Sequence, residues 1–184
     1  MEFVEPIRDL DKIRIMKCLL IKQSVRDYLF FTLGINTGLR VNQMLEFKVK
    51  DIVGEDGNPR EFIQVSPNKR GIYLNDSVRY AIRKFIERQR LSREDYLFAS
   101  GQKGKPISRQ HAYRIIKQVA AKVGLEDHIG TQTLRKTFGY HAFRQGVALS
   151  LLQERFHHVT PSETLKYIGI KKEEIVIPMI DVNL

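Results

Sequence analysis

Four residues spread over most of the chain carry the groups needed for chemistry on a phosphodiester: Arg40, Arg135, His158 and Tyr167. Arginine presents a planar fork that binds two phosphate oxygens at once, and two arginines would neutralise the charge of a pentacovalent transition state. A phenol can attack phosphorus, although its pKa of about 10 requires help from neighbouring cations. An imidazole can donate a hydrogen bond to the phosphate. The set predicts nucleophilic attack on a phosphodiester without a metal or a cofactor.

The spacing of these residues carries more information than any one of them. Residues 37–40 read TGLR, so the first arginine follows a glycine turn that can aim its side chain. The second lies in residues 133–138, TLRKTF; His158 comes 23 residues after Arg135, and Tyr167 nine residues later. A lone arginine in a basic protein is usually a surface residue, and a lone tyrosine on an amphipathic helix usually belongs to the core. The ordered set of four residues favours a functional role over an ordinary surface arginine or core tyrosine.

From about Tyr28 to Gly169 the ordered set resembles the catalytic domain of the tyrosine recombinases, the phage integrase family. That family joins two arginines, a histidine or tryptophan, a β-hairpin lysine and a nucleophilic tyrosine. The resemblance implies an α+β fold that is mainly α-helical with a small antiparallel β-sheet. It also implies site-specific DNA recombination, in which strands are cut and rejoined through a 3′-phosphotyrosine intermediate that leaves a 5′-hydroxyl. Tyr167 would be the nucleophile, and Arg40 and Arg135 would hold the phosphate.

A short hairpin is predicted to carry the lysine. Residues 62–65 and 71–74 are β-like runs on either side of a turn at residues 66–70. The resemblance makes Lys69, at the tip of this hairpin, the general acid for the 5′-oxygen. Because the basic stretch is shorter than is usual in the family, Arg70 is an alternative.

Two positions depart from the family pattern. Gln132 stands three residues before Arg135, where the family commonly has histidine. Glutamine can donate a hydrogen bond to a phosphate oxygen but cannot shuttle a proton, so impaired chemistry is one possible consequence. Gln43 stands three residues after Arg40, where the family usually has an acid that helps to orient the site.

The remaining histidines near these motifs are expected to be structural. His157 and His158 are adjacent, and the family register favours His158 as the residue that donates to the phosphate. His157 is expected to pack or to meet solvent. His141, six residues after Arg135, is expected to be a hydrogen-bonded structural histidine.

The charge of the chain favours a polyanionic partner, and we expect double-stranded DNA. The 184 residues carry a net charge of +10 at a pI near 9.8. Between residues 97 and 153 the only acids are Glu126 and Asp127, so this stretch predicts a contiguous basic surface rather than a mixed, solvated helix face. Four of its basic residues are candidate DNA contacts: Lys103, Lys105, Arg109 and Lys136.

Other classes of protein are disfavoured. Cys18 is the only cysteine, so an intramolecular disulfide is impossible, and its apolar neighbours predict a buried position. No Cys/His cluster has metal-site spacing, no apolar run is long enough to span a membrane, and the acidic N-terminus is no signal peptide. We therefore expect a protein of the bacterial cytoplasm, associated with the nucleoid.

Apolar periodicity and capping signals predict the elements that must position these residues. Threonine, proline and glutamate at residues 160–163 give a clear start to the helix that carries Tyr167. An apolar tail follows at residues 176–182. We expect helices over residues 9–23, 24–37, 41–47, 78–86, 112–123, 131–146, 150–156 and 161–168, with Asp76 capping the fourth and a short edge strand over residues 96–99.

The resemblance leaves the domain organisation and the activity open. It implies that residues 1–184 form a single catalytic domain without the N-terminal core-binding domain of the family, either as a fragment or as a short relative. It implies self-association on DNA, as a tetramer in the family, and a monomer or weak oligomer when the protein is free of DNA. A type IB topoisomerase shares the tyrosine chemistry, and a DNA-binding or regulatory module with impaired catalysis is the alternative from another class.

Overall fold

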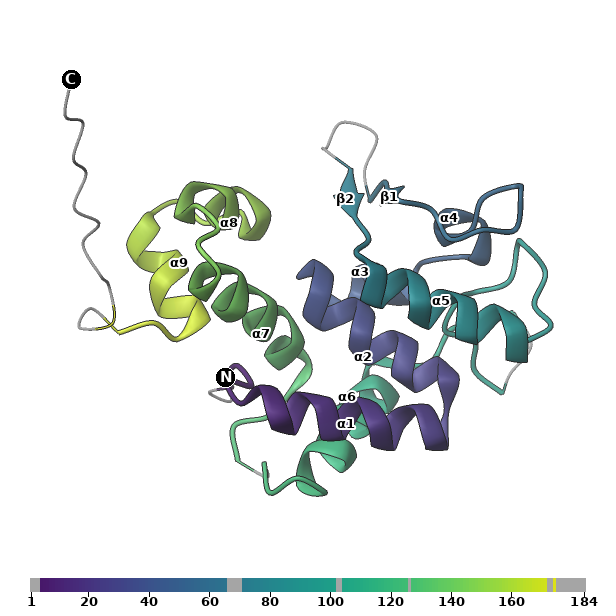
Figure 1. Cartoon of the computed structure of the whole chain (residues 1–184), viewed down its shortest axis with the longest axis horizontal. Coiled ribbons are helices and arrows are strands. Elements are labelled where there is room, and N and C mark those ends of the chain that lie inside the picture. The colour runs from purple at the N-terminus through teal and green to yellow at the C-terminus, as the bar shows by residue number, and fades with distance from the viewer. Residues whose placement is uncertain (1–3, 66–70, 102–103, 126, 172–173, 175–184) are drawn as a thin grey trace.

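The computed structural model describes residues 4–65, 71–101, 104–125, 127–171 and 174. These residues are mainly helical with one two-stranded antiparallel sheet, so the predicted fold class is confirmed (Figure 1). The elements are α1 Leu10–Gln23, α2 Val25–Thr37, α3 Val41–Leu45, α4 Val49–Ile52, β1 Phe62–Ile63, β2 Ile72–Tyr73, α5 Asp76–Arg88, α6 Arg109–Ala121, α7 Thr131–Arg144, α8 Leu149–Phe156 and α9 Pro161–Ile168.

The first two helices begin one residue after their predicted starts, and in each the preceding residue is the cap. The Asp9 side chain accepts hydrogen bonds from two backbone amides of α1, and Ser24 accepts one from Asp27 of α2. Helix α2 ends at Gly38, whose φ of 65° is the left-handed conformation that glycine adopts without a steric penalty. This turn delivers the chain directly to Arg40 and α3.

Helix α2 is the centre of the main core. It is buried along most of its length and packs against α1, α5 and α7. Phe30 is fully buried and meets Phe98 edge to face at 5.3 Å between ring centroids. We use the term main core for the apolar cluster that runs from Ile7 through α1–α6 to Leu134 at the start of α7.

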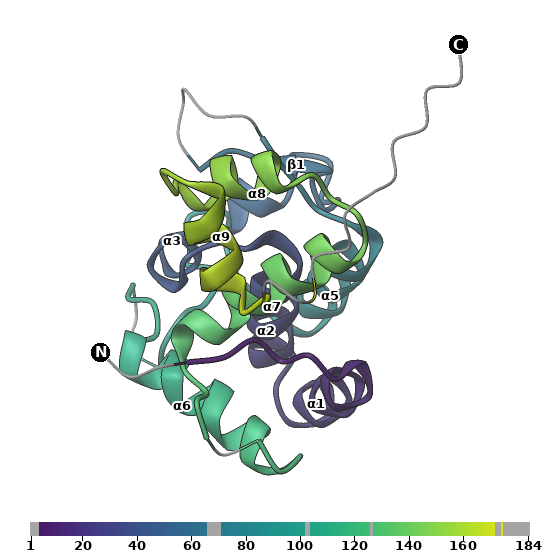
Figure 2. The same ribbon diagram turned by 90° about the vertical axis from the view of Figure 1, so that its left-hand side faces the viewer.

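A second, smaller apolar cluster lies at the other end of α7. Figures 1 and 2 show α8 and α9 packed on the C-terminal part of α7, to one side of the helices that form the main core. We call this the C-terminal cluster; its buried members are Leu152, Phe156, Ile168 and Ile170. Gly139 permits the close packing, because a Cβ there would lie 2.5 Å from Ile168 and 2.7 Å from Phe156. Helix α9 begins at its predicted cap, Thr160, with Pro161 in the first turn.

Three local predictions were wrong, and one short helix was not predicted. Asn75, not Asp76, caps α5, since its side chain accepts from the amide of Val78. Residues 96–99 form no strand and take part only in isolated bridges, because the chain turns before a ladder can extend. The short helix α4 was not expected. Cys18 is exposed, since α1 turns Ile13, Met16 and Leu20 towards the core instead.

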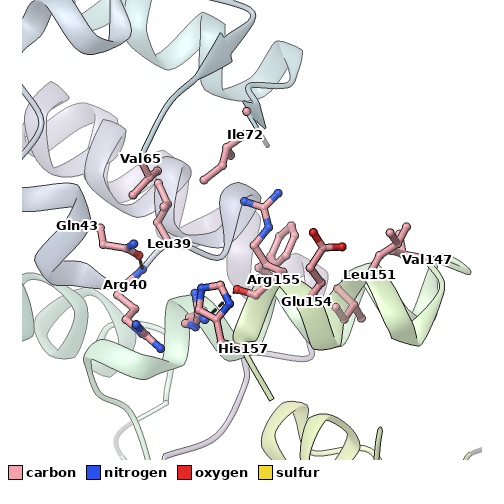
Figure 3. Close-up of a pocket in the computed structure, with 14 residues that line it drawn as sticks. Leu39, Arg40, Gln43, Val65, Ile72, Val147, Leu151, Glu154, Arg155 and His157 are labelled. Atoms are coloured by element: carbon pink, nitrogen blue, oxygen red, sulfur yellow. Dashed lines mark hydrogen bonds between the residues drawn. The ribbon is translucent and has the colours of Figure 1, made fainter. Parts of the chain in front are cut away.

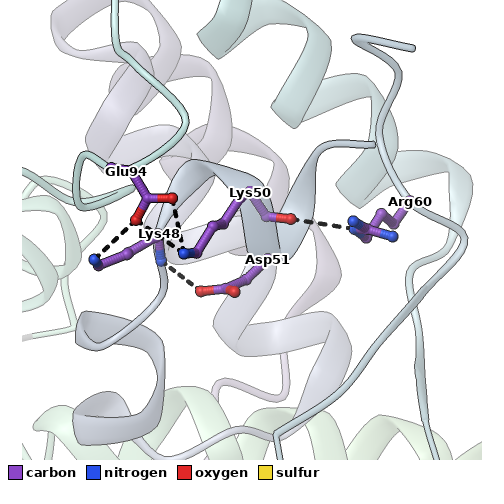
Figure 4. Close-up of polar contacts among 5 residues, drawn as sticks. All are labelled: Lys48, Lys50, Asp51, Arg60 and Glu94. Atoms are coloured by element: carbon purple, nitrogen blue, oxygen red, sulfur yellow. Dashed lines mark hydrogen bonds and ion pairs between the residues drawn. The ribbon is translucent and has the colours of Figure 1, made fainter. Parts of the chain in front are cut away.

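Helix α4 is held to the segment that follows α5 by polar contacts (Figure 4). Glu94 accepts from Lys50 at 2.8 Å and from Lys48 at 3.2 Å, and the amide of Lys48 donates to Asp51. All of these side chains are at least partly exposed, and such pairs contribute at most about 1 kcal/mol each. The segment is therefore held mainly by its backbone bonds and by buried neighbours such as Leu97.

Candidate active site

One concavity brings together five of the six predicted catalytic residues. Its volume is about 320 Å³, and its wall includes all four residues of the original set together with Gln132. They come from the turn after α2, from α7, from the loop after α8 and from α9. The full lining is Arg40, Val41, Asn42, Arg109, Thr131, Gln132, Arg135, Phe156, His158 and Tyr167. The sixth residue, Lys69, lies outside the described residues.

Arg135 is the buried centre of the site, with only 7% of its surface exposed. Its Nη1 donates to the carbonyl of Gly38, and its Nη2 donates to the carbonyl of Arg155 at 3.2 Å. Its guanidinium carbon lies 4.7 Å from the centroid of the Phe156 ring. Burial lowers the pKa of the guanidinium, but arginine stays charged. This one side chain therefore fixes the TGLR turn and α8 relative to each other.

Arg40 is exposed and is aimed by its turn. Its backbone amide donates to the side-chain oxygen of Gln43 at 3.0 Å, which caps the start of α3. Gly38 could not be replaced there, since its φ is positive and a Cβ would lie 2.4 Å from Phe138. Gln43 thus supplies a capping oxygen at the position where an acid was expected.

The ring of Tyr167 is held among other side chains. Its centroid lies 5.2 Å from that of Phe156 and 4.9 Å from that of His158. Burial raises the pKa of the phenol, while Arg135, as a charge and hydrogen-bond partner, and Arg40 act in the opposite direction. In this arrangement the phenol is protonated at neutral pH, and the two arginines are the groups that favour its ionised form.

His158 is oriented by its neighbour on α9. Its Nδ1 lies 3.1 Å from the hydroxyl oxygen of Thr164, so Nε2 is the ring nitrogen left to meet a ligand. Burial lowers the pKa of the imidazole; Glu163 opposes this shift, and Arg135 and Arg40 add to it. A bound phosphate would favour the protonated, donating form.

The other predicted residues lie in different surroundings. Arg109 lies at the start of α6 and lines the concavity, whereas Lys105 is exposed but is not part of its wall. Lys136 is partly buried, and its Nζ donates to the carbonyl of Val4 at 2.8 Å. Lys103 is outside the described residues. His141 is structural as predicted, since its Nε2 lies 2.9 Å from the carbonyl oxygen of Ile7.

A larger hollow of about 680 Å³ adjoins the site (Figure 3). It shares Arg40 and Arg135 with the smaller concavity and runs between the hairpin residues Val65 and Ile72 and helix α8. His157, exposed and with a positive φ of 60°, lines this hollow rather than the smaller one.

Sequence reasoning missed the groups that hold the arginine in place. The carbonyls of Gly38 and Arg155 accept from Arg135, and no side-chain pattern could have identified a backbone acceptor. Asn42 and Thr131 in the wall were also missed, although both adjoin the predicted motifs. Among the described residues, no group of His, Cys, Asp and Glu is placed to hold a metal ion. No helix in the described part of the chain is long and apolar enough to cross a membrane.

Comparison with known structures supports the fold. The crystal structure of XerA recombinase superposes with a TM-score of 0.75 at 19% sequence identity, covering 93% of this chain and 63% of that one. XerH site-specific recombinase, in its pre-cleavage complex with difH substrate, gives a TM-score of 0.70 at 20% identity, covering 94% and 53%. The fold is that of the tyrosine recombinase catalytic domain.

Comparison of sequences gives the family. The chain is 40% identical over 173 residues to the probable integrase/recombinase YoeC of Bacillus subtilis, covering 94% of this chain and 93% of that protein. It is 31% identical over 160 residues to tyrosine recombinase XerD of Oceanobacillus iheyensis, covering 84% of this chain and 53% of that protein, so it spans about half of this longer relative. The profile of the Phage integrase family matches residues 10–174. Because the match covers most of the chain and includes the concavity built around Arg135, the chain belongs to the phage integrase family.

Proposed function

We propose that this protein cuts and rejoins DNA strands through a covalent link between Tyr167 and a 3′-phosphate. The observation that carries the proposal is the convergence of Arg40, Arg135, His158 and Tyr167 on one concavity, although they come from four separate segments. A single phosphate of DNA could touch all four groups there. The net charge of +10 and the exposed Arg109 beside the site favour DNA as the polyanion.

In the proposed reaction the Tyr167 phenol releases its proton to solvent, its oxygen attacks phosphorus, and the bond to the 5′-oxygen breaks. Arg135 would bind phosphate oxygens from the buried side and Arg40 from the exposed side, so that both stabilise the added charge of the transition state. His158 would donate a hydrogen bond from Nε2 to a phosphate oxygen. Lys69 is proposed as the acid that protonates the departing 5′-oxygen. Exchange of strands between two duplexes requires more than one active site, so we infer that copies of the chain meet on DNA.

The test is covalent trapping on nicked DNA. The substrate is a library of nicked duplexes with randomised flanking sequence. After attack the short fragment that carries the 5′-hydroxyl dissociates, so the reverse reaction is prevented. The covalent adduct therefore accumulates and is visible on a denaturing gel. We expect an adduct with the native chain and none with Tyr167→Phe, which removes one hydroxyl and keeps the ring contacts with Phe156 and His158. An adduct that persists in Tyr167→Phe would show that another residue is the nucleophile.

Gln132 can be tested on the same substrate. If its inability to carry a proton limits the reaction, Gln132→His should raise the rate of adduct formation. The side chain is exposed in the wall of the concavity, so the change should leave the folding stability nearly unchanged. An equal rate would mean that glutamine is fully competent at this position.

A second function is favoured by the state of the phenol. Tyr167 is partly buried and its pKa is raised, which would suit a DNA-binding module with slow or absent catalysis. Such a module would bind duplex DNA with an affinity that falls steeply as salt increases, yet would form no adduct with any member of the nicked library. Binding and trapping measured on the same preparation separate the two functions.

A further inference from the structure

The segment before α1 lies across α7 instead of extending into solvent. We call residues 4–8 the strap; Figure 2 shows it, in purple, passing below α7 and α9 on its way to α1. The amide of Ile7 donates to the Thr137 hydroxyl at 2.9 Å, and the Ile7 carbonyl lies 2.9 Å from Nε2 of His141. The amide of Glu5 donates to the carbonyl of His128 at 2.7 Å. The strap is therefore bonded along the helix that carries Arg135.

The strap also holds the end of the helix that carries Tyr167. Arg8 donates from Nη2 to the carbonyl of Gly169 at 3.0 Å, and its guanidinium lies 5.5 Å from the ring centroid of Tyr140. Gly169 caps α9 with a φ of 74°, two residues after Tyr167. Pro6 packs on the same glycine, since a Cβ there would lie 3.4 Å from its ring.

Lys136 joins the strap to the phenol itself. Its Nζ donates to the carbonyl of Val4 at 2.8 Å and lies 5.2 Å from the centroid of the Tyr167 ring. The ring thus has a cation from α7 near one face, in addition to Phe156 and His158. Because Lys136 contacts both the Val4 carbonyl and the Tyr167 ring, a shift of the strap would move the cation next to the phenol.

We propose that the strap is a positioning element for the nucleophile, with Arg8 and Lys136 as its positioning residues. The inference rests on the proposed function for its catalytic consequence, but its structural part stands alone. The C-terminal cluster has few buried members, and α7 adds only partly buried apolar side chains to it, so a further bond to the end of α9 from outside that cluster helps to place this helix. The strap supplies this tether and links it to the main core through Ile7.

The placement matters because attack on phosphorus requires the phenol oxygen to lie in line with the departing oxygen. A misplacement of about 1 Å can lower a rate by roughly 100-fold. Loss of the Arg8 bond to Gly169 frees the end of α9 without touching any residue in the wall of the concavity. The predicted signature is a slower chemical step at unchanged DNA affinity.

The structural part is tested by hydrogen exchange of the full chain. In Arg8→Ala we expect the amides of residues 161–170 to exchange about 10-fold faster than in the native chain, while those of α2 keep their protection. Arg14→Ala is the matched control, because Arg14 is an exposed arginine on α1 whose ion pair with Asp11 is also exposed. Equal exchange of residues 161–170 in the two variants would overturn the proposal.

The catalytic part is tested by the rate of adduct formation on an excess of the nicked library. We expect Arg8→Ala and Lys136→Met to slow the adduct by roughly 10- to 100-fold, with Arg8→Lys and Lys136→Arg recovering most of the loss. DNA affinity, measured by anisotropy with a labelled duplex, should change less than 3-fold for the Arg8 variants. A weaker affinity that accounts for the whole loss would instead make Arg8 a DNA contact. If the native chain forms no adduct, the proposed catalysis fails, and the exchange experiment alone decides whether the strap holds α9.

Discussion

The main core and the C-terminal cluster each carry part of the candidate site, but the main core has many more buried apolar residues. The main core runs through six helices and the start of α7, and the TGLR turn with Arg40 is part of its surface. The C-terminal cluster has four buried members and carries His158 and Tyr167. Arg40 is thus attached to the large apolar core, and Tyr167 to the small one.

This difference suggests why Arg135 makes two carbonyl bonds. Small units with few buried contacts open at a lower free energy than the body they are attached to. Arg135 ties the turn at Gly38 to the end of α8, and so restricts that opening at the site. A movement of the small unit would then shift Tyr167 without displacing the turn that carries Arg40.

The largest expected effect comes from deleting one buried ring in each region. Phe30→Ala should cost about 3–5 kcal/mol and lower the melting temperature of the whole chain, because Phe30 is fully buried and packs on Phe98. Phe156→Ala removes the same atoms from the C-terminal cluster, where Phe156 is 2% exposed. We expect rapid hydrogen exchange in α8 and α9 with α2 still protected. Global unfolding in both variants would mean that the two regions form one cooperative unit.

The next effect concerns the side chain that joins the regions. Arg135→Met leaves the carbonyls of Gly38 and Arg155 without this donor, at a cost of about 1–3 kcal/mol for the buried Gly38 acceptor and less for the partly buried Arg155 acceptor. It should also abolish the DNA adduct. Arg135→Lys keeps the charge but not the fork, so it should restore part of the stability and little of the adduct. Full activity in the lysine variant would argue against two simultaneous carbonyl bonds, and denaturant unfolding with trapping provides both measurements.

A smaller effect is expected from one methyl group on α7. Replacing a helical glycine with alanine normally stabilises by up to about 1 kcal/mol. In Gly139→Ala the new Cβ would lie 2.5 Å from Ile168 and 2.7 Å from Phe156, so overpacking at about 1–3 kcal/mol should dominate. Gly101→Ala is the control, since a Cβ there meets nothing within 4 Å. Stabilisation by Gly139→Ala would show that α9 can move away from α7 at little cost.

The smallest effect compares a histidine in each region as the pH falls. Burial lowers the pKa of His158, and of His111 beside Arg26, from the ordinary value of 6.5. Each region is therefore at full stability above about pH 6.5 and becomes less stable as the pH falls through this value, since the unfolded form binds the proton more readily. Protection factors of α9, corrected for intrinsic exchange, should fall as the pH is lowered from 7.5 to 5.5. In His158→Gln this pH-dependent fall should disappear. An unchanged pH profile in His158→Gln would assign the effect to another group.

Residue types and their spacing were enough to predict most of the helices and the members of the candidate site. Asp9, Ser24 and Thr160 cap helices through local hydrogen bonds, and such bonds can be predicted from residue type and spacing. The ordered motifs identified Arg40, Arg135, His158 and Tyr167, which the structure brings to one concavity.

How these residues are held depends on the packing of the helices, which residue spacing does not show. The acceptors of Arg135 are backbone carbonyls from segments 97 residues before it and 20 residues after it, and residue type does not show which backbone carbonyl will accept a bond. The same holds for the bond from Arg8 to the carbonyl of Gly169, 161 residues away. The division into two apolar clusters was equally invisible, because a pattern of buried positions does not say which other helix covers them. Local signals specify elements and residue chemistry, whereas long-range backbone contacts depend on how those elements pack.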